Sequence, residues 1–462
     1  MSLVPAVNAS DIKMTLDKDH FKAHLTGLVE QSAGPVSFSA SAAAHQPRFI
    51  VAYSGGLDSH VLLHLVHSSG LSCLAVYIDH GLQALSKSWS AHCAANCQLL
   101  AVEFQSVSVN ARAAAGESPE ASARTARYRA LAELMRPGDI LLTAQHLQDQ
   151  AETLLLQMLR TAGPDGLAAM PQTKLFAQGW HLRPLLGVAR TELEAYARHH
   201  QLQWIEDPSN TDQRYDRNFF RQSVFPLLQQ RWPAINQTLS NVSLLQAEAS
   251  ELMNDLAALD APSMISGDTL AISALIRLSP ARQRNSIRYW LKQLELDVPT
   301  AKRLHEILGP MLTAADDKSP LVSWAETEVR RFQGDLYAMP RLSEHAASQH
   351  LTWSGRQVIN LESLRQQVLL QSAETGLSTD ILHKSLTIRF RQGGEKIKPA
   401  GRAHTMDLKK LMQQAAIPPW LRDRIPLLYL DDELIAVADY WQADGYQNKP
   451  GQAGLQFISL AD

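Results

Sequence analysis

The six residues from Ser54 to Ser59 (Ser-Gly-Gly-Leu-Asp-Ser) place hydroxyls, glycines and one carboxylate in a single short turn. The turn follows a strand-forming run at 49–53 and precedes a helix-forming run at 60–66, so it should expose backbone N–H groups at the positive end of a helix dipole. Asp58 would repel a phosphate unless a divalent cation lies between them. The pattern predicts a nucleoside triphosphate and Mg²⁺ site formed by Ser54, Gly55, Gly56, Leu57, Asp58 and Ser59.

This turn differs from the two commonest phosphate-binding loops. No Gly-Lys-Ser/Thr follows the glycines, as in a Walker A loop, and the dinucleotide fingerprint G-x-G-x-x-G is absent. Without a lysine to reach the terminal phosphates, the turn argues against ordinary γ-phosphoryl transfer. The plainer alternative is a glycine-rich turn with a Ser/Asp helix cap, which many α/β proteins contain.

The elements that must position this turn alternate between strands and helices. Candidate strands are Phe49–Tyr53, Leu74–Ile78, Phe104–Val109 and Ile140–Thr143, with helical stretches between them. Such alternation predicts right-handed βαβ units and an α/β fold with a doubly wound parallel sheet. Ligands bind at the carboxyl ends of such strands. We therefore expect the Ser54 turn, Asp79-His80-Gly81 and His146–Asp149 to share one edge.

A chain of 462 residues is too long for one core, so several domains are expected. The pattern becomes helical from about Arg231, and short β-like runs resume at about Leu386. We predict a flexible N-terminal extension (1–46), an α/β catalytic domain (47–230), a helical middle domain (231–342), a connecting region (343–385) and a small α+β C-terminal domain (386–462).

Composition narrows the class of protein. The chain is 45% hydrophobic and 19% charged, as in ordinary globular proteins, and no apolar stretch approaches a membrane span, so we expect no membrane partner. Three cysteines suggest no disulfide framework, and a cytoplasmic location is expected. The net charge of −3 hides a basic stretch between Lys384 and Arg424 that suits a phosphate backbone, although a solvated charged surface would look the same.

Three further segments carry reactive side chains. They are Glu120–Tyr128, Thr143–Thr153 with its continuation to Leu167, and Trp204–Asn210 with Tyr215–Asn218. Together with Ser54–Ser59 and Asp79–Leu82, they resemble the tRNA(Ile)-lysidine synthetases, which belong to the N-type ATP pyrophosphatase (PP-loop) superfamily with its loop signature S-G-G-x-D-S. Gly394–Ile397, Leu408–Leu411 and Ile417–Leu421 resemble the C-terminal domain of the longer bacterial form.

The resemblance implies a ligase that modifies RNA. Such an enzyme uses ATP to adenylate O2 of the wobble cytidine in a CAU-anticodon tRNA(Ile), and the amine of L-lysine then attacks C2, giving lysidine, AMP and pyrophosphate. It also implies that residues 231–342 and 386–462 bind tRNA. It leaves open whether two copies form a homodimer.

The resemblance also implies roles for three residues. Asp58 and Asp149 would act in catalysis and hold Mg²⁺, and Arg124 would stabilise charge on the base or the phosphates. Asp149 could equally be an acidic residue that interacts with the dipole at a helix start. Gln148 departs from the family, which usually has a second Asp there, and this weakens a paired-carboxylate metal site. His146 is as suited to orienting the loop as to catalysis.

Three other functions are compatible with an ATP pyrophosphatase loop. Thiolation of tRNA would need a cysteine pair or cluster, whereas Cys93 and Cys97 are four residues apart and lack C-x-x-C spacing. An amidotransferase-type synthetase would need a glutaminase segment, and none is evident. A non-catalytic RNA-binding relative is favoured only by Gln148.

Overall fold

The computed structural model describes residues 16–33, 47–81, 86–110, 119–208, 212–315 and 318–461. The chain divides into two compact units, residues 1–252 and 253–462. Among the helices of the described residues, none has the length and apolar character needed to cross a membrane.

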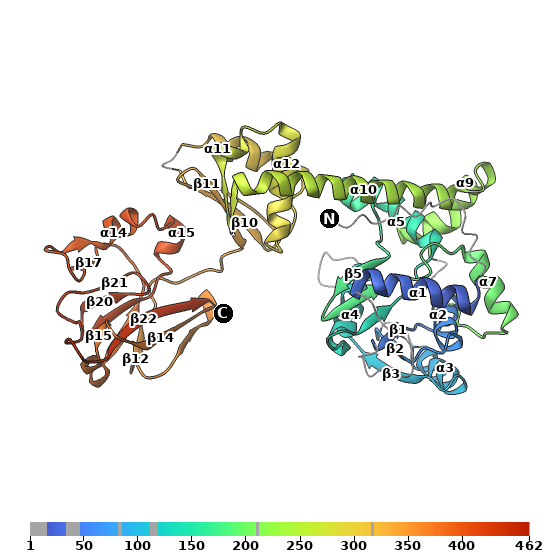
Figure 1. The fold of residues 1–462 in the computed structure, drawn as a ribbon, viewed down its shortest axis with the longest axis horizontal. Helices are drawn as coiled ribbons and strands as arrows, with labels where there is room; N and C mark the ends of the chain where they lie inside the picture. The colour runs from blue at the N-terminus through green and yellow to red at the C-terminus, as the bar shows by residue number, and fades with distance from the viewer. Residues whose placement is uncertain are drawn as a thin grey trace. The chain divides into compact units, whose positions relative to one another are not determined.

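The first unit is built on a six-stranded sheet in the order β3-β2-β1-β4-β6-β5 (Figure 1). Its strands are β1 (Phe49–Ala52), β2 (Cys73–Asp79), β3 (Glu103–Ser108), β4 (Ile140–Leu142), β5 (Thr173–Phe176) and β6 (Gly179–Leu182). All neighbouring pairs are parallel except β5 with β6. The predicted doubly wound parallel sheet is therefore confirmed, with an antiparallel edge strand added.

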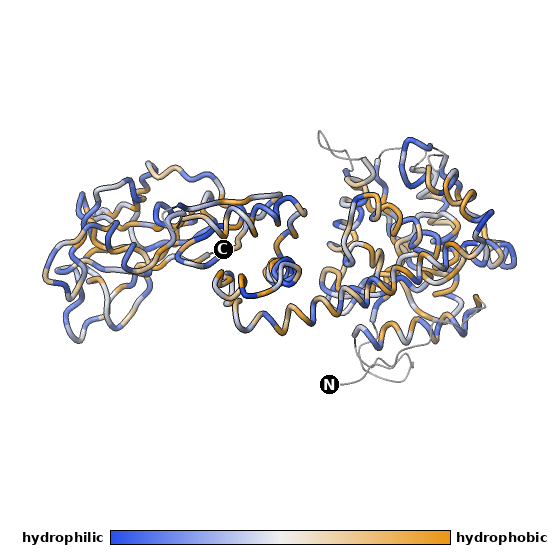
Figure 2. Tube along the Cα trace, turned by 90° about the horizontal axis from the view of Figure 1, so that it is seen from above, coloured by the Kyte–Doolittle hydropathy of each residue, from blue (hydrophilic) through white to orange (hydrophobic). Residues whose placement is uncertain are grey.

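Helices connect the parallel strands and cover the sheet. They are α2 (Leu57–Ser68), α3 (Ser86–Leu99), α4 (Pro119–Leu134), α5 (Leu147–Leu159), α6 (Pro164–Leu167) and α7 (Arg190–His199). Strand β1 is buried almost throughout, because both faces of the sheet are covered. In Figure 2 the apolar colour is concentrated in the interior of this unit.

The expected flexible extension at residues 1–46 is wrong for residues 18–33. These form helix α1 (Lys18–Ala33), whose Phe21, Leu25 and Val29 are fully buried in the same core as β1 and α2. Their spacing of four residues places them on one face of the helix, and the free energy of burying that face fixes it against the domain. Residues 34–46 lie outside the described residues.

After α7 the chain runs through three short helical segments into one long helix. These are α8 (Asp216–Phe219), η2 (Phe220–Val224), α9 (Phe225–Arg231) and α10 (Ile235–Asp260). The segment η2 is a single π-helical turn, a feature that often marks functional positions.

The middle region was expected to be helical, and this is only partly right. It contains η3 (Ala261–Ser263), α11 (Ile272–Leu275), α12 (Pro280–Gln293), α13 (Ala301–Glu306) and η4 (Ile307–Met311). It also contains an antiparallel sheet, β7-β8-β11-β10-β9, formed by β7 (Ile265–Ser266), β8 (Thr269–Ala271), β9 (Leu321–Trp324), β10 (Thr327–Phe332) and β11 (Asp335–Pro340). Trp290 of α12 and Val329 of β10 share one buried core, so the helices need this sheet as their packing partner.

The C-terminal part contains two larger sheets and a short ribbon. One sheet has the order β12-β16-β19-β20-β21 and the other β13-β14-β22-β15, while β17 pairs with β18. The strands are β12 (Leu351–Trp353), β13 (Ile359–Leu361), β14 (Gln366–Ala373), β15 (Leu377–Ser378), β16 (Leu386–Arg389), β17 (Lys396–Ile397), β18 (Met406–Asp407), β19 (Leu427–Leu430), β20 (Glu433–Val437), β21 (Trp441–Gln442) and β22 (Gly454–Ala461). Helical turns η5 (Glu362–Leu364), η6 (Thr379–His383), α14 (Leu408–Gln414) and α15 (Pro419–Arg422) complete it.

Residues 343–385 are therefore more than the connecting region that was expected. Strand β12 pairs with β16, and β14 pairs with β22 along its whole length. Both larger sheets contribute to one core, which includes Trp353, Val368 and Phe457. The strands of 343–385 acquire their burial from partners as far away as Ala461, which pairs with Gln366, and local patterns do not reveal such pairings.

Candidate active site

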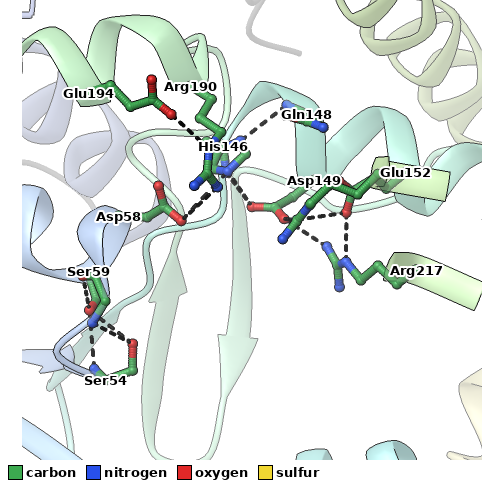
Figure 3. A network of polar contacts seen from close by, with 12 residues as sticks. Ser54, Asp58, Ser59, His146, Gln148, Asp149, Glu152, Arg190, Glu194 and Arg217 are labelled. Atoms are coloured by element: carbon green, nitrogen blue, oxygen red, sulfur yellow. Dashed lines mark hydrogen bonds and ion pairs between the residues drawn. The ribbon is translucent and has the colours of Figure 1, made fainter. Parts of the chain in front are cut away.

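Hydrogen bonds of Ser54 and Ser59 stabilise the turn between β1 and α2. The Ser59 hydroxyl accepts from the backbone N–H of Ser54 at 3.2 Å and lies 3.1 Å from the Ser54 hydroxyl (Figure 3). It also donates to the carbonyl of Gly56 at 3.0 Å. Helix α2 begins at Leu57, a buried core residue, so the first N–H groups of the helix face the turn. Exposed N–H groups at a helix start are suited to binding an anion.

Gly55 is required by both backbone conformation and space. Its φ of +78° lies in the left-handed region, and a Cβ there would come within 2.8 Å of Cys93 Sγ and 2.9 Å of Ile205 Cδ1. Its carbonyl accepts from the Ile205 N–H at 2.9 Å, which ties the turn to the segment before α8. The turn is therefore held from two sides.

Asp58 lies in the first turn of α2 with one carboxylate oxygen unpartnered. Its Oδ2 is 3.7 Å from His146 Nε2 and 3.8 Å from Arg190 Nη1. Its Oδ1 is buried and has no hydrogen-bond partner among the described residues. Burial raises the pKa of Asp58, and the charges of His146 and Arg190 only partly oppose this. An unpartnered carboxylate oxygen in a turn with backbone N–H groups at a helix start has the chemistry that Mg²⁺ requires.

His146 is the N-cap of α5 and is fully buried. Its Nδ1 accepts from the backbone N–H of Gln148 at 3.2 Å. The ring proton of the neutral form is therefore on Nε2, which lies between Asp58 Oδ2 at 3.7 Å and Asp149 Oδ2 at 3.4 Å. Since the cap uses only the backbone of Gln148, the replacement of the family's usual Asp leaves this cap intact.

Asp149 completes the cap and joins a buried ion-pair cluster. Its Oδ2 accepts from the His146 N–H at 3.0 Å, and its Oδ1 accepts from Arg217 Nη2 at 2.9 Å and Arg221 Nη2 at 3.0 Å. Burial alone would raise the pKa of Asp149, but His146 and the two guanidinium groups together lower it. Both carboxylate oxygens are engaged, so a metal at Asp149 would compete with arginine donors. The metal role of Asp149 stays a prediction.

Glu152 supplies the second acid of this cluster and is fully buried. It accepts from Arg217 Nε at 2.8 Å (Figure 3) and from Arg221 Nε at 2.8 Å. One turn of α5 thus places Asp149 and Glu152 on one face, where they hold α8 and η2. Sequence reasoning gave no role to Glu152, Arg221 or Arg190. Two spacings in the sequence could have indicated this cluster: the acids Asp149 and Glu152 are three residues apart, and the arginines Arg217 and Arg221 are four residues apart.

Among the described residues, Arg124 forms no ion pair with the carboxylates of this cluster and contacts an aromatic ring instead. Its guanidinium carbon is 5.2 Å from the centre of the Tyr128 ring on the same helix, α4. The Tyr128 ring is 5.6 Å from that of His181 on β6. Arg124 is exposed, so its charge is available to a ligand at this part of the sheet edge.

The three cysteines are buried and unpaired. Burial raises the pKa of Cys73 and Cys93 to about 12 and that of Cys97 to about 11. All three thiols are core residues, and Cys93 packs under Gly55. They therefore lack the exposed thiolate that a sulfur carrier needs.

Three family models match the chain. Residues 20–228 match the PP-loop domain, residues 270–337 the TilS substrate binding domain and residues 386–459 the TilS substrate C-terminal domain. The first match includes most of α1, in agreement with the packing of that helix against the sheet.

Curated relatives extend over most of the chain. The tRNA(Ile)-lysidine synthase of Methylococcus capsulatus is 41% identical over 88% of this chain and 94% of its own length. Those of Coxiella burnetii and Pseudomonas syringae pv. tomato are 40% and 42% identical over 88% and 86% of this chain, and over 92% and 90% of their own lengths. Identity at this level over nearly whole chains decides the family. The chain belongs to the tRNA(Ile)-lysidine synthase family.

Proposed function

We propose that this protein uses ATP to join L-lysine to C2 of the wobble cytidine in a CAU-anticodon tRNA(Ile). The proposal rests chiefly on Asp58 in the first turn of α2. Its buried Oδ1 has no hydrogen-bond partner among the described residues and lies where a cation bound to the phosphates would need a ligand. Membership of the family supports the same substrates. The reaction would take place in the cytoplasm, where tRNA is modified.

The turn would hold the phosphates of ATP. Backbone N–H groups at the start of α2 and the hydroxyls of Ser54 and Ser59 are the donors, and Asp58 would hold Mg²⁺ through Oδ1. The cation would neutralise charge on the departing pyrophosphate. His146 and Arg190 lie 3.7 Å and 3.8 Å from the other oxygen of Asp58, so their attraction orients the carboxylate and leaves Oδ1 to the cation.

The chemistry has two balanced steps. Cytidine O2 attacks the α-phosphorus of ATP, and the bond to the β-phosphate oxygen breaks with release of pyrophosphate. The lysine amine then attacks C2, and O2 leaves with AMP while the amine loses a proton. The amine must be neutral when it attacks, so a base near it must accept its proton. Asp149 is our candidate for positioning the amine, because its lowered pKa and its two engaged oxygens make it a poor acceptor of that proton.

The C-terminal parts of the chain would bind the RNA. Residues 270–337 and 386–459 match the two TilS substrate domains. Basic residues outnumber acidic ones between Lys384 and Arg424, and several of them are exposed. This supports contact with the phosphate backbone rather than with a small molecule.

The buried thiols argue against tRNA thiolation. A sulfur carrier must present a thiolate to its substrate, and the three cysteines are core residues with raised pKa values. The intact turn and the available oxygen of Asp58 argue against a decayed, RNA-binding relative.

Pyrophosphate release tests the proposal. The purified protein is given ATP, Mg²⁺ and lysine, with the CAU-anticodon tRNA(Ile), with the methionine tRNA of the same anticodon, or without RNA. We expect release only with the isoleucine tRNA. Equal release without RNA would point to a small-molecule substrate, and RNA binding without release would point to a non-catalytic relative.

A further inference from the structure

A chain of hydrogen bonds runs through the interior of the first unit from Arg183 to Gln145. Arg183 Nη2 lies 3.3 Å from His181 Nδ1, and His181 Nε2 lies 2.7 Å from the Thr143 hydroxyl. That hydroxyl donates to Oε1 of Gln145. Arg183, His181 and Thr143 are 3%, 0% and 5% exposed, so water does not compete for these bonds. We call these four residues the Gln145 relay.

The first member of the relay fixes the direction of every bond. A guanidinium only donates, so His181 Nδ1 must accept. Burial and neighbouring cations lower the pKa of His181 to about 2, so the ring is neutral and its one proton is on Nε2. That proton is donated to Thr143, and the hydroxyl proton is then directed at Gln145 Oε1. The amide of Gln145 cannot turn over without breaking this order, so its NH₂ group points away from the relay.

Gln145 lies at the edge of the sheet that carries the phosphate-binding turn. It follows β4, which pairs in parallel with β1, and it directly precedes His146, whose Nε2 is 3.7 Å from Asp58 Oδ2. The side chain is partly exposed, and its NH₂ group donates to no partner in the part of the chain that the structure describes. A ligand at this edge can therefore reach it.

The surroundings of the relay also supply donors. Arg124 lies over the Tyr128 ring, and Lys174 of β5 lies 5.9 Å from the Phe176 ring, on the side of the sheet where His181 packs. Buried Arg183 leaves Nε without a hydrogen-bond partner among the described residues. A region of this kind favours a base edge or phosphate that accepts hydrogen bonds.

We propose that the Gln145 amide is a base-reading group that donates to N3 of the target pyrimidine, with Thr143 and His181 as positioning residues. Cytosine presents an unprotonated N3 acceptor, whereas uracil presents an N3–H donor. An unrestrained amide would turn over and accept from uracil, but the relay prevents this. The inference rests on the proposed function for the identity of the base, and it adds how the same site rejects uridine.

The test compares two transcripts of the isoleucine tRNA, with a CAU or a UAU anticodon. For each protein, the discrimination ratio is kcat/KM for pyrophosphate release with the CAU transcript divided by the affinity of the UAU transcript, which is the reciprocal of its inhibition constant. Gln145→Ala and Thr143→Val should each lower this ratio by about tenfold, the value of one lost neutral hydrogen bond with its unpaired partner. Thr143→Ser keeps the hydroxyl and should keep the ratio.

Two further variants separate base reading from a structural role. Gln145→Glu can still accept from Thr143 but presents an oxygen to the base, so the UAU transcript should now bind more tightly than the CAU transcript. The double variant Thr143→Val with Gln145→Ala should lose no more discrimination than Gln145→Ala alone, because both changes act through one amide. Equal ratios for all variants, or additive losses, would overturn the proposal.

The relay can also be tested without catalysis. In the ¹⁵N spectrum of the whole protein, the His181 signals, assigned by their absence from His181→Gln, should show a protonated Nε2 and an unprotonated Nδ1. The opposite tautomer overturns the relay. A wild-type protein with the expected tautomer but no RNA-dependent pyrophosphate release would instead contradict the proposed function and, with it, the contact to cytosine.

Discussion

At the scale of single residues, Asp58 and Asp149 both lie in the first turn of a helix but have opposite environments. Each is an acid in the first turn of a helix that follows a parallel strand. Asp149 accepts from a backbone N–H and two arginines, whereas the described residues leave one oxygen of Asp58 without a partner. The first is therefore stabilised by the fold, and the second is the carboxylate that we propose to hold the cation.

Replacing Asp149 should destabilise the fold in a pH-dependent way. Because the pKa of Asp149 is lowered from 3.8, its contribution is present above about pH 4 and is lost as the pH falls through the lowered value. Asp149→Asn should cost about 3–5 kcal/mol at pH 7, since it leaves buried arginines less well paired. Urea unfolding of both proteins should show this difference shrinking below about pH 4. A difference independent of pH would contradict this role.

Replacing Asp58 should instead lower activity strongly without loss of stability. Burial raises the pKa of Asp58, so its ionised form costs stability above that pKa. We expect Asp58→Asn to lower kcat for pyrophosphate release by roughly 10²–10³-fold while Tm stays the same or rises. A variant that keeps its activity would show that this carboxylate does not hold the cation.

The same comparison shows the limit of sequence reasoning about the site. The turn 54–59 and the acid at the start of α5 were predictable, because their chemistry is local. The pairing of Asp149 and Glu152 with Arg217 and Arg221 was not, since these residues are 65 to 72 positions apart. Only the folded chain brings them together.

At the scale of elements, four of the five parallel strands were predicted to within one residue at either end, and β6 was not predicted. Strands buried on both faces read as continuous apolar runs, which local patterns detect. Helix α1 was missed because it follows residues of mixed polarity and is fixed by distant partners in β1 and α2. The sheet of the middle region was missed because its strands are short and rich in charged residues, as in β10.

Helix α1 should be essential for the stability of the first unit. Phe21 is fully buried in its core, so Phe21→Ala should cost about 3–5 kcal/mol by leaving a cavity. Glu30→Ala, at an exposed position of the same helix, is the matched control and should change stability by less than about 0.5 kcal/mol. Equal urea midpoints for both variants would show that α1 is dispensable.

At the scale of the whole molecule, the chain joins a catalytic unit to domains that bind RNA. The basic stretch of the C-terminal part is only partly available, since Arg389, Arg391 and Lys398 form ion pairs with Asp432, Asp423 and Asp444. Lys396, Arg402 and Lys409 are exposed, and the described residues offer them no ion-pair partner. These three are the cations most able to contact phosphates.

Replacing these three cations with alanine should weaken tRNA binding in a salt-dependent way. Each lost phosphate contact should reduce the slope of log affinity against log salt by about 1, with little change in kcat at saturating tRNA. Lys398→Ala, which removes a cation already paired with Asp444, is the control. An unchanged salt slope would place the RNA on another surface.

The proposed function requires that the cluster around Asp58 forms lysidine on RNA. The most direct measurement is mass spectrometry of the nucleosides from CAU-anticodon tRNA(Ile) incubated with the protein, ATP, Mg²⁺ and isotope-labelled lysine. We predict that the labelled lysine is found covalently bound to the wobble cytidine with wild-type protein and is absent with Asp58→Asn. An unmodified cytidine with folded wild-type protein, or equal labelling by the variant, would contradict the account.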